Sequence, residues 1–505
     1  MSKFNPLLGV GFLVLSFFTL AVSAENALLL NPANRSININ PDTRLQLTFA
    51  EAPLIGSSGK IRVFEAGTDR LVDVLDLSLP AGPTKGVTGP KAPYIQSPYS
   101  YEGQRKSNAD TKPGTPSGGA AATPDSFQLT IIGGFTDGFH FYPVLVRGKT
   151  ASIQLHHNLL QYGKTYYVQI DAFVFTNGFE GISGKKNWIF STKKAAPSLR
   201  KDLIKVSADG SADFNTVQGA LDFIPDNASG TKTIFIRNGD YEEIVYFRNK
   251  QHLTIRGENS EKVLVHYANN EVFNPHPSNL STNELPGTFP SRRAAFAVDH
   301  CSDIRLENLT IQTTVRGQAE GLLVNGDRIF VKNVTIIGSG DALQTNGSAY
   351  YVDSKVIGEG DMILGRGAAF FKNCFFQSYG AFMWIRNTAA NHGNVCLNCT
   401  FQTLGKGETE IARAPANGGK GYPNCEAVLL NCKLAGISPL GWGPIGGDSA
   451  KVHYWEFNST NLSNGKPVDT SNRHPASKQL TREKDAALIE QYSMPEFVLE
   501  GWKPE

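Results

Sequence analysis

Residues 334–373 consist of one sequence written twice, VTIIGSGDALQTNGSAYYVD followed by SKVIGEGDMILGRGAAFFKN. Within the two copies, Gly338-Ser339-Gly340-Asp341 lies over Gly358-Glu359-Gly360-Asp361 at a period of 20 residues. Each copy combines β-branched runs with turn glycines, and a short period of this kind is typical of a solenoid. The repeat therefore predicts stacked coils of short strands.

The repeat continues on both sides of this pair. Six segments open with Asn or Asp and then alternate apolar or small residues with polar ones, beginning at Asn308, Asn333, Asp353, Asn373, Asn398 and Asn431. Their uneven spacing suits a right-handed parallel β-helix, whose turns absorb insertions. Alternation points Leu309, Val334, Cys374 and Cys399 into the core. The predicted fold class is therefore all-β, and a structural Asn ladder is expected at the segment starts, in preference to glycosylation.

The same stacking gives Asp341 and Asp361 equivalent positions in successive coils. Neighbouring strands lie about 4.8 Å apart, so two outward-facing carboxylates would be near neighbours. A repulsion of roughly 3 kcal/mol would separate their proton affinities by about two pKa units. One group would stay ionised while the other kept a proton, as a nucleophile and an acid require. The alternative is that both are solvated turn residues.

Composition favours a β-rich protein with more than one domain. The chain has 505 residues, of which 19% are charged and 50 are glycine, with a formal net charge of +2. Low charge and many glycines are typical of turn-dense β-proteins. No basic stripe is present, so no nucleic-acid partner is predicted.

The first 24 residues have the pattern of a secretory signal peptide. Lys3 supplies a positive charge, Leu7–Val22 an apolar run, and Val22-Ser23-Ala24 a cleavage site. The apolar run is short and no second hydrophobic span follows it, so no membrane span is expected. We expect a secreted protein, extracellular or periplasmic.

All six cysteines occur late in the chain, between residues 301 and 432. Cys374, Cys399 and Cys432 occupy the core position of the repeat, and secretion permits disulfides. Packed thiols, or one disulfide, are therefore expected. Cys396 and Cys399 have a redox-like or metal-like spacing but no partner pair at zinc-ribbon spacing, so no metal site is predicted.

Residues 25–198 form a separate region of alternating segments. These segments are Leu45–Phe49, Lys60–Phe64, Ser126–Ile131, Ser152–Leu155 and Tyr166–Ile170. Turn signals separate them, which predicts a β-sandwich that resembles the Ig-like modules of secreted bacterial enzymes. An insertion around 81–125 is rich in Pro, Gly, Ser, Thr and Ala. The sandwich shows no catalytic constellation, and spacing or carbohydrate contact is its expected role.

The predicted β-helix domain, residues 199–505, opens with a characteristic series of motifs. The segment 209–218 reads DGSADFNTVQ, a short helix is expected over Val217–Phe223, and Gly239-Asp240-Tyr241-Glu242-Glu243 follows. Further on come Gln318-Ala319-Glu320-Gly321-Leu322, Gly340-Asp341-Ala342-Leu343 and Asp361-Met362-Ile363-Leu364-Gly365. In this order the segments resemble the pectin methylesterase (pectinesterase) family, in its bacterial type with an N-terminal Ig-like domain.

The resemblance implies an esterase mechanism and a set of roles. Asp361 would be the nucleophile, Asp341 the acid and then the base, and Gln318 a donor to the oxyanion. The family's catalytic arginine segment best matches Ile411-Ala412-Arg413-Ala414-Pro415, which makes Arg413 the partner of Asp361. The rival is Arg386, about one coil earlier. No metal or cofactor is implied.

Two positions depart from the family pattern. Gly340 replaces a glutamine that would donate to the oxyanion, and Pro415 lies near the place of a tryptophan. Losing one oxyanion donor can cost on the order of 10²–10³ in rate. Gln344 is an imperfect substitute, because alternation places it on the face opposite Asp341. For substrate binding we consider Trp384, Arg386 and Gln344. The neighbouring aromatics Phe382 and Tyr379 serve either stacking on sugars or packing.

The sequence thus predicts a secreted, monomeric carboxylic ester hydrolase that demethylates pectin. Polygalacturonases and pectate lyases share the parallel β-helix, and paired acids also suit glycosidic hydrolysis. A glycosidase or lyase acting on pectin is therefore one alternative. The other, motivated by Gly340 and Pro415, is a non-catalytic carbohydrate-binding protein on an esterase scaffold.

Overall fold

The computed structural model describes most of the chain outside the N-terminus and the long polar insertions. The described residues are 28–82, 118–120, 129–133, 139–176, 178–226, 228–274, 292–417, 419 and 421–505. The predicted signal peptide and nearly all of the insertion around 81–125 lie outside them.

Two β-sheets form the N-terminal region. One has the order β1-β3-β10-β9 and the other β2-β12-β11-β4-β5. The first contains β1 (Leu29–Asn31), β3 (Leu45–Thr48), β10 (Thr150–Ile153) and β9 (Val144–Arg147). The second contains β2 (Ser36–Ile39), β12 (Ile189–Thr192), β11 (Thr165–Ile170), β4 (Lys60–Glu65) and β5 (Arg70–Asp76). Leu47, Val63 and Trp188 belong to one shared core, which confirms the β-sandwich. Its Ig-like type stays a prediction.

Four smaller elements complete the described part of this region. A short three-stranded sheet and one 3-10 turn accompany the sandwich, namely β6 (Gly118–Ala120), β7 (Leu129–Ile131), β8 (Phe139–His140) and η2 (Ala172–Val174).

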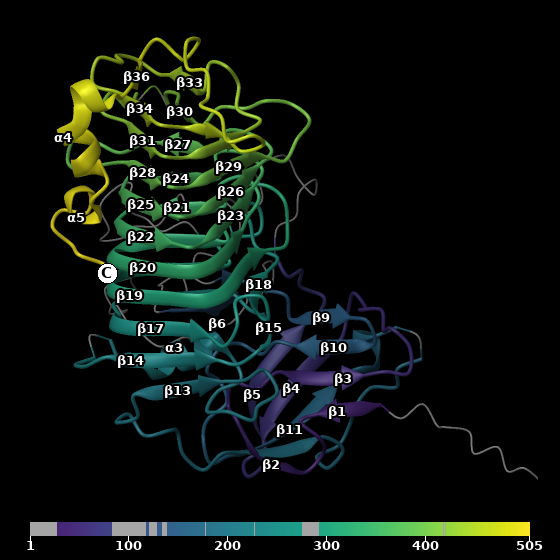
Figure 1. Cartoon of the computed structure of the whole chain (residues 1–505). Coiled ribbons are helices and arrows are strands. Elements are labelled where there is room, and N and C mark those ends of the chain that lie inside the picture. Colours follow the sequence, from purple (N-terminus) through teal and green to yellow (C-terminus); the bar gives the residue numbers. More distant parts are fainter. Residues whose placement is uncertain are drawn as a thin grey trace, which may run out of the picture.

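A single sheet of 24 strands follows, in which every pairing is parallel (Figure 1). Its first strands are β13 (Leu203–Val206), β14 (Lys232–Ile236), β15 (Gly239–Glu242), β16 (Val245–Arg248), β17 (Gln251–Gly257), β18 (Val263–Tyr267), β19 (Phe296–Thr313) and β20 (Leu322–Ile337). From β21 to β32, each strand pairs with the third strand after it, so each of these coils contributes three strands. This confirms the predicted parallel β-helix.

The later strands stack on three faces. The first face carries β21 (Leu343–Thr345), β24 (Ile363–Gly365), β27 (Met383–Ile385), β30 (Ala412–Ala414) and β33 (Trp442–Ile445). The second carries β22 (Ser348–Val352), β25 (Ala368–Lys372), β28 (Asn394–Leu397), β31 (Glu426–Leu430), β34 (His453–Phe457) and β36 (Ser477–Gln479). The third carries β23 (Lys355–Gly358), β26 (Phe375–Ser378), β29 (Thr400–Thr403), β32 (Lys433–Ala435) and β35 (Thr460–Asn461).

The interior of the coils is the main core. Leu309, Val334, Cys374 and Cys399 all belong to it, and none is more than 2% exposed. All six cysteines are free and buried, and the backbone N–H of Cys374 donates to Sγ of Cys399 at 3.4 Å. The expectation of packed thiols is therefore confirmed, without the disulfide that was its alternative.

The segment-opening residues form the expected ladder. Asn308, Asn333, Asp353 and Asn373 have φ values of 57°, 52°, 50° and 54°, in the left-handed region that Asn and Asp tolerate best. Nδ2 of Asn333 donates to Oδ1 of Asn308 at 3.0 Å, and Nδ2 of Asn373 donates to Oδ1 of Asp353 at 3.3 Å. The side-chain amides are thus used to connect successive coils.

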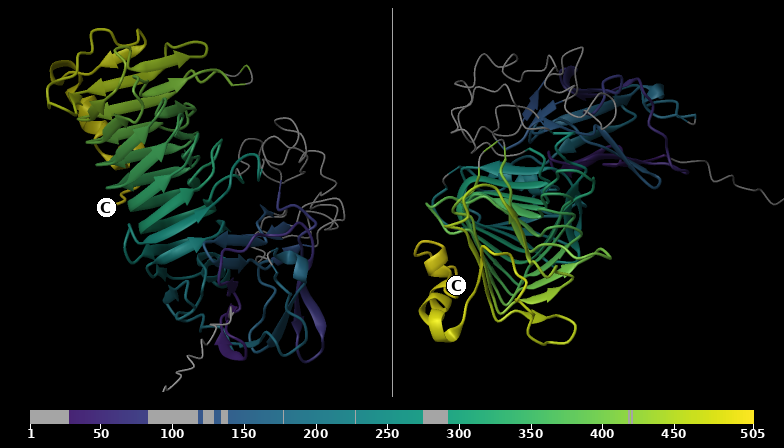
Figure 2. Two further views of the ribbon diagram at one scale, coloured as in Figure 1. Left: turned by 90° about the vertical axis from the view of Figure 1, so that its right-hand side faces the viewer. Right: turned by 90° about the horizontal axis from the view of Figure 1, so that it is seen from above.

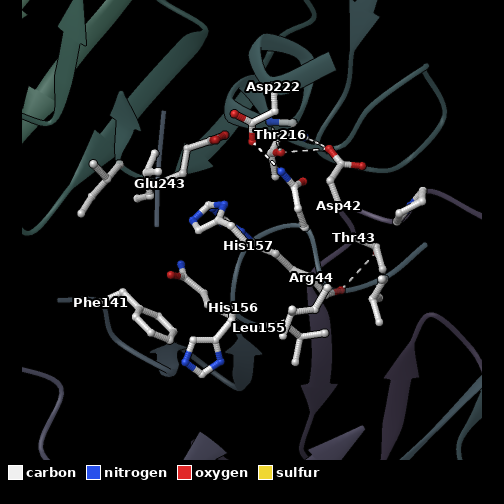
Figure 3. Close-up of a pocket in the computed structure, with 18 of the residues that line it drawn as sticks. Asp42, Thr43, Arg44, Phe141, Leu155, His156, His157, Thr216, Asp222 and Glu243 are labelled. Atoms are coloured by element: carbon white, nitrogen blue, oxygen red, sulfur yellow. Dashed lines mark hydrogen bonds between the residues drawn. The ribbon is translucent and has the colours of Figure 1, made fainter. Parts of the chain in front are cut away.

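A short helix closes the N-terminal end of the coils. α3 (Val217–Phe223) has the predicted bounds, and its Val217, Ala220 and Leu221 pack into the interior. Oδ2 of Asp42, from the sandwich, accepts the Thr216 backbone N–H and the Thr216 hydroxyl at 2.8 and 2.9 Å (Figure 3). The sandwich therefore holds the N-terminus of the helix that covers the β-helix.

The pocket at this junction is lined by buried ionisable groups (Figure 3). Burial lowers the pKa of His157 to about 4 and raises the pKa of Glu243, whose two oxygens accept the N–H groups of Val217 and Gln218. These contacts belong to the attachment of the sandwich to the first coils.

Two helices lie along the outside of the coils at the C-terminal end, α4 (Arg482–Tyr492) and α5 (Pro495–Val498) (Figure 2). They cover outward-facing apolar residues of the second face, including Tyr350 and Phe370. Leu499, directly after α5, belongs to the same apolar cluster. In the described part of the chain, no helix is long and apolar enough to cross a membrane.

The Asn ladder generates a stability prediction. Asn333→Ala loses a hydrogen bond and forces alanine into a left-handed conformation, so we expect a loss of about 1–2 kcal/mol and a lower Tm. Asn333→Gly loses the same hydrogen bond without the conformational strain. Thermal unfolding followed by circular dichroism should rank wild type above Asn333→Gly, and Asn333→Gly above Asn333→Ala. The reverse order of the two variants would contradict this account.

Candidate active site

The two repeated aspartates lie directly before strands of the first face, Asp341 before β21 and Asp361 before β24. Gly340 pairs with Gly360 in the parallel register, so the aspartates that follow them are neighbours in successive coils. Both have positive φ values, 70° at Asp341 and 45° at Asp361. The predicted stacking of these two positions is therefore present.

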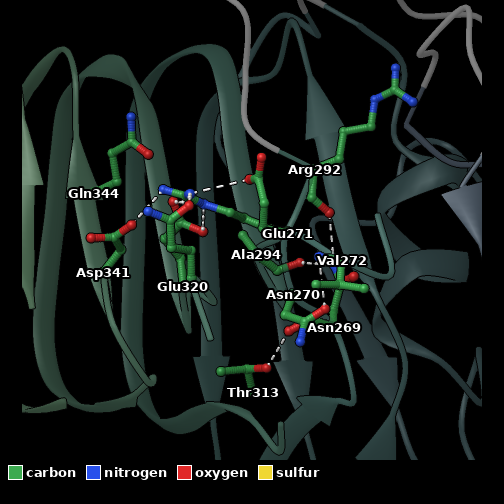
Figure 4. A network of polar contacts seen from close by, with 12 residues as sticks. Asn269, Asn270, Glu271, Val272, Arg292, Ala294, Thr313, Glu320, Asp341 and Gln344 are labelled. Carbon is green, nitrogen blue, oxygen red and sulfur yellow. Dashed lines mark hydrogen bonds and ion pairs between the residues drawn. The ribbon is translucent and has the colours of Figure 1, made fainter. Parts of the chain in front are cut away.

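The left-handed residue at each strand start interrupts the side-chain alternation. Ala342 and Leu343 are consecutive, yet both belong to the interior core. Gln344 consequently leaves the coil on the same side as Asp341 (Figure 4). The expectation that Gln344 lies opposite Asp341 was wrong, because it assumed an uninterrupted strand from 341 to 344.

Arg413 comes to Asp361 from two coils away. Its Nε donates to Oδ1 of Asp361 at 2.7 Å, and one of its terminal nitrogens contacts Oδ2. Leu364 pairs with Trp384, and Trp384 pairs with Arg413, so the strand register delivers the guanidinium to this point. The carboxylate side chain is 14% exposed. Of the two arginines considered from the sequence, Arg413 is the one that pairs with Asp361.

Asp341 is more buried and has a different cation. A terminal nitrogen of Arg293 lies 2.9 Å from Oδ2 of Asp341, whose side chain is 9% exposed. Burial is the largest influence and raises the pKa of Asp341, the positive charge of Arg293 opposes it, and the charge of Asp361 adds to the increase. The predicted direction is therefore present, but its main cause is burial and not repulsion between the aspartates.

Sequence reasoning missed Arg293, which connects four polar groups of the site. Its Nε donates to both carboxylate oxygens of Glu320 at 2.8 Å, and its other nitrogens contact Glu271 at 3.2 Å and Asp341 (Figure 4). Glu320 is fully buried, and burial raises its pKa to about 7. The available signal was Glu320 itself, a charged residue between Ala319 and Gly321 directly before the apolar start of β20.

Arg293 also orients Gln318. One of its terminal nitrogens donates to Oε1 of Gln318 at 3.0 Å. A guanidinium only donates, so the amide oxygen must face Arg293 and the amide N–H groups point elsewhere. Gln318 pairs with Gly340, where a side chain is absent. The exposed Nε2 amide group of Gln318 therefore lies beside Gly340, the residue directly before Asp341.

The remaining predicted contacts fall into two groups. Phe382 is fully buried in the core, so it is not available for stacking on a sugar, whereas Tyr379 is 60% exposed. Trp384 has two guanidinium groups near its ring, that of Arg386 at 4.7 Å from the ring centroid and that of Arg413 at 5.9 Å. Arg386 is 8% exposed and makes no contact with Asp361.

This arrangement suits acyl transfer. A carboxylate fixed by a cation can act as a nucleophile, and a buried carboxyl with a raised pKa can donate a proton. An amide donor beside them can stabilise an oxyanion. In the described ranges, no three His, Cys, Asp or Glu side chains come close enough together to hold a metal ion.

Comparisons with known proteins point to one family. The profile of the pectinesterase family matches residues 203–501. A pectinesterase of Arabidopsis thaliana is 29% identical over 331 residues, covering 60% of this chain and 80% of the relative. A pectinesterase of Ralstonia solanacearum is 28% identical over 353 residues, covering 59% and 88%. The solved pectin methylesterase from carrot is 21% identical with a TM-score of 0.49, covering 59% of this chain and 93% of the carrot chain.

The family match spans more than half of the chain and includes both aspartates, Gln318 and Arg413. The protein therefore belongs to the pectinesterase family of carboxylic ester hydrolases.

Proposed function

We propose that this protein hydrolyses the methyl esters of pectin, with Asp361 as the nucleophile. The observation that carries the proposal is the two-pronged contact of Arg413 with Asp361 beside the buried Asp341, in a chain of this family. Arg413 balances the charge of the Asp361 carboxylate and fixes its orientation for attack.

In the first half of the reaction, a carboxylate oxygen of Asp361 attacks the ester carbonyl carbon of a galacturonate unit. The N–H groups of Gln318 stabilise the oxyanion that forms, because they lie on the side of the amide that Arg293 leaves open. Asp341 donates its proton as the carbon–oxygen bond to the methoxy group breaks, and methanol leaves.

In the second half, Asp341 is ionised and acts as the base. It takes a proton from a water molecule, whose oxygen attacks the carbonyl of the acyl-enzyme. The bond to Asp361 then breaks, which releases the carboxylic acid of the galacturonate unit and restores both aspartates. The new acid then loses its proton to the solvent.

The proposal includes export, because residues 1–24 have the signal-peptide pattern described above and pectin is a polysaccharide outside the cell. Cell fractionation, with N-terminal sequencing of the exported protein, tests it. A mature protein beginning at Glu25 is expected, and a cytoplasmic protein that keeps Met1 would contradict export.

The direct test of function is methanol release from highly methylated pectin by the purified protein. We expect methanol without new reducing ends. Reducing ends or unsaturated products without methanol would instead favour a glycosidase or lyase, and binding without any product would favour a non-catalytic protein.

The two aspartates should differ in the severity of their variants. Asp361→Asn removes the nucleophile, so methanol release should fall to background. Asp341→Asn keeps the nucleophile but removes the acid and base, which typically costs 10²–10⁴-fold. Asparagine tolerates the left-handed backbone at both positions, so thermal melts should be close to wild type. A folded Asp361→Asn protein with near wild-type turnover would exclude the mechanism.

The two arginines near Trp384 should also differ. Arg413→Ala leaves Asp361 without the cation that orients it, so most activity should be lost. Arg386→Ala leaves the Arg413–Asp361 pair intact and should retain more. Steady-state methanol release from one pectin preparation compares the two, and the opposite ranking would move the catalytic assignment to Arg386.

Glu320 should set the alkaline limb of the pH–rate profile. In Glu320→Gln, Arg293 no longer shares its positive charge between Glu320 and Asp341, so Asp341 feels more of it. The variant also removes the negative charge of Glu320 from the neighbourhood of Asp341. Both changes lower the pKa of Asp341, so the acid loses its proton at a lower pH and the alkaline limb should move down. Glu307→Gln, whose carboxylate pairs with Arg305 instead, is the control. An unmoved limb in Glu320→Gln would exclude this electrostatic connection.

A further inference from the structure

An irregular segment, residues 268–274, follows β18 and lies beside the active site. None of its residues belongs to a strand. The backbone N–H of Glu271 donates to the carbonyl of Gln318 at 2.8 Å, and the Glu271 carboxylate lies 3.2 Å from a nitrogen of Arg293. The segment therefore contacts both the oxyanion donor and the cation that pairs with Asp341.

Asn269, in this segment, fixes the backbone on both sides of Arg293. Its Nδ2 donates to the carbonyl of Arg292 at 2.7 Å and to that of Ala294 at 2.8 Å (Figure 4). The side chain is fully buried, and burying an amide is costly unless its polar atoms are hydrogen-bonded. Asn269 thus acts as a clamp that sets where the side chain of Arg293 leaves the backbone.

Asn274 sets the orientation of this clamp. Both N–H groups of the Asn269 amide are used, so its Oδ1 accepts, and Nδ2 of Asn274 donates to it at 2.9 Å. Asn274 also pairs with the backbone of His140. The His140 N–H donates to Oδ1 of Asn274 at 2.8 Å, and the His140 carbonyl accepts from Nδ2 at 3.1 Å. Because a backbone N–H only donates and a carbonyl only accepts, this pair permits one orientation of each amide.

The N-terminal region makes further contacts with the same segment. Nδ1 of His140 lies 2.7 Å from the Phe273 carbonyl and donates to it, since a carbonyl only accepts. Burial lowers the pKa of His140 to about 4, so the imidazole is neutral near pH 7. The ring of Tyr142 stacks on that of Phe273, with centroids 4.5 Å apart, and the Arg292 guanidinium lies 5.7 Å from the centroid of the Phe139 ring. β8 and the residues after it therefore hold this segment by hydrogen bonds and by ring contacts.

We infer that the N-terminal region positions the catalytic acid, Asp341, by holding Arg293 in place. The connection runs through three buried residues, His140, Asn274 and Asn269. The inference rests on the proposed function, because the role of Asp341 as the acid is what makes the position of Arg293 important. None of the three residues contacts the reacting groups, so they are positioning residues. The N-terminal region is thus the outer support of the active site.

The first test compares two buried asparagines at the junction of the N-terminal region with the coils. Asn274→Ala breaks the connection to Asn269. Asn40→Ala is the matched control, because Asn40 is also 2% exposed but its Nδ2 donates to Oδ1 of Asn215 at 2.8 Å, in the segment before α3. We expect the kcat of methanol release to fall about 10- to 100-fold in Asn274→Ala with little change in KM, since a misplacement of about 1 Å can cost on the order of 10²-fold. Asn40→Ala should keep the wild-type kcat. A kcat that is equal in the two variants overturns the inference.

The pH–rate profile gives a readout that a general loss of stability does not move. The positive charge of Arg293 lowers the pKa of Asp341. In Asn274→Ala, Arg293 is no longer held against Asp341, so the pKa of Asp341 rises and the acid keeps its proton to a higher pH. The alkaline limb should therefore move up, in the direction opposite to that expected for Glu320→Gln. An alkaline limb that stays in place in folded Asn274→Ala contradicts the inference.

A second pair of variants tests the connection if Asn274→Ala does not fold. His140→Leu removes the donor to the Phe273 carbonyl, whereas His140→Asn restores an N–H donor near the place of Nδ1. The kcat should fall several-fold in His140→Leu and return toward the wild-type value in His140→Asn. A kcat at the wild-type value in His140→Leu, or one equally low in both variants, overturns the inference.

Crystal structures of Asn274→Ala and Asn40→Ala test the connection without turnover. The contact of Arg293 with Asp341, 2.9 Å in the wild type, should be lost in Asn274→Ala and kept in Asn40→Ala. If Arg293 is displaced in this way but the wild type releases no methanol, the proposed function fails while the positioning of Arg293 by the N-terminal region stands. If Arg293 stays against Asp341 in Asn274→Ala, the inference is overturned even when the wild type is an active esterase.

Discussion

The parallel register between coils is the constraint on which the rest of this structure depends. Each strand hydrogen-bonds to its equivalent in the next coil, so residues of one kind recur about 4.8 Å apart. For apolar residues such as Leu343 and Ile363 the result is a continuous core. For charged residues it brings like charges together, as with Asp341 and Asp361, and such a stack requires cations from elsewhere in the chain.

Those cations arrive from opposite directions along the coils. Arg413 reaches Asp361 from a later strand, β30, and Arg293 reaches Asp341 from the segment before β19. The two aspartates consequently have unequal surroundings. Asp361 has a guanidinium for its two oxygens, whereas Asp341 is more buried and shares Arg293 with Glu320. Burial then raises the pKa of Asp341, and the stacked pair acquires the asymmetry that an acid and a nucleophile need.

The structure shows what surrounds Gly340, one of the positions that depart from the family pattern. Gly340 leaves bare backbone beside Gln318, and Arg293 fixes the Gln318 oxygen so that its N–H groups remain available. Farther along the same face, Arg386 is 8% exposed, and its Nε has no hydrogen-bond partner among the described residues.

The sequence by itself determined the solenoid, the interior positions and the neighbouring aspartates, because the period of 20 residues states which positions are stacked. It also indicated Arg413 through its family motif. Only the tertiary structure showed that Gln344 points to the same side of the coil as Asp341, because the left-handed backbone at Asp341 interrupts the alternation that sequence patterns assume. The roles of Arg293 and Glu320 were likewise visible only in the tertiary structure. The two residues are far apart in the sequence and come together only because the chain between them completes a coil. A local sequence pattern does not indicate such a contact.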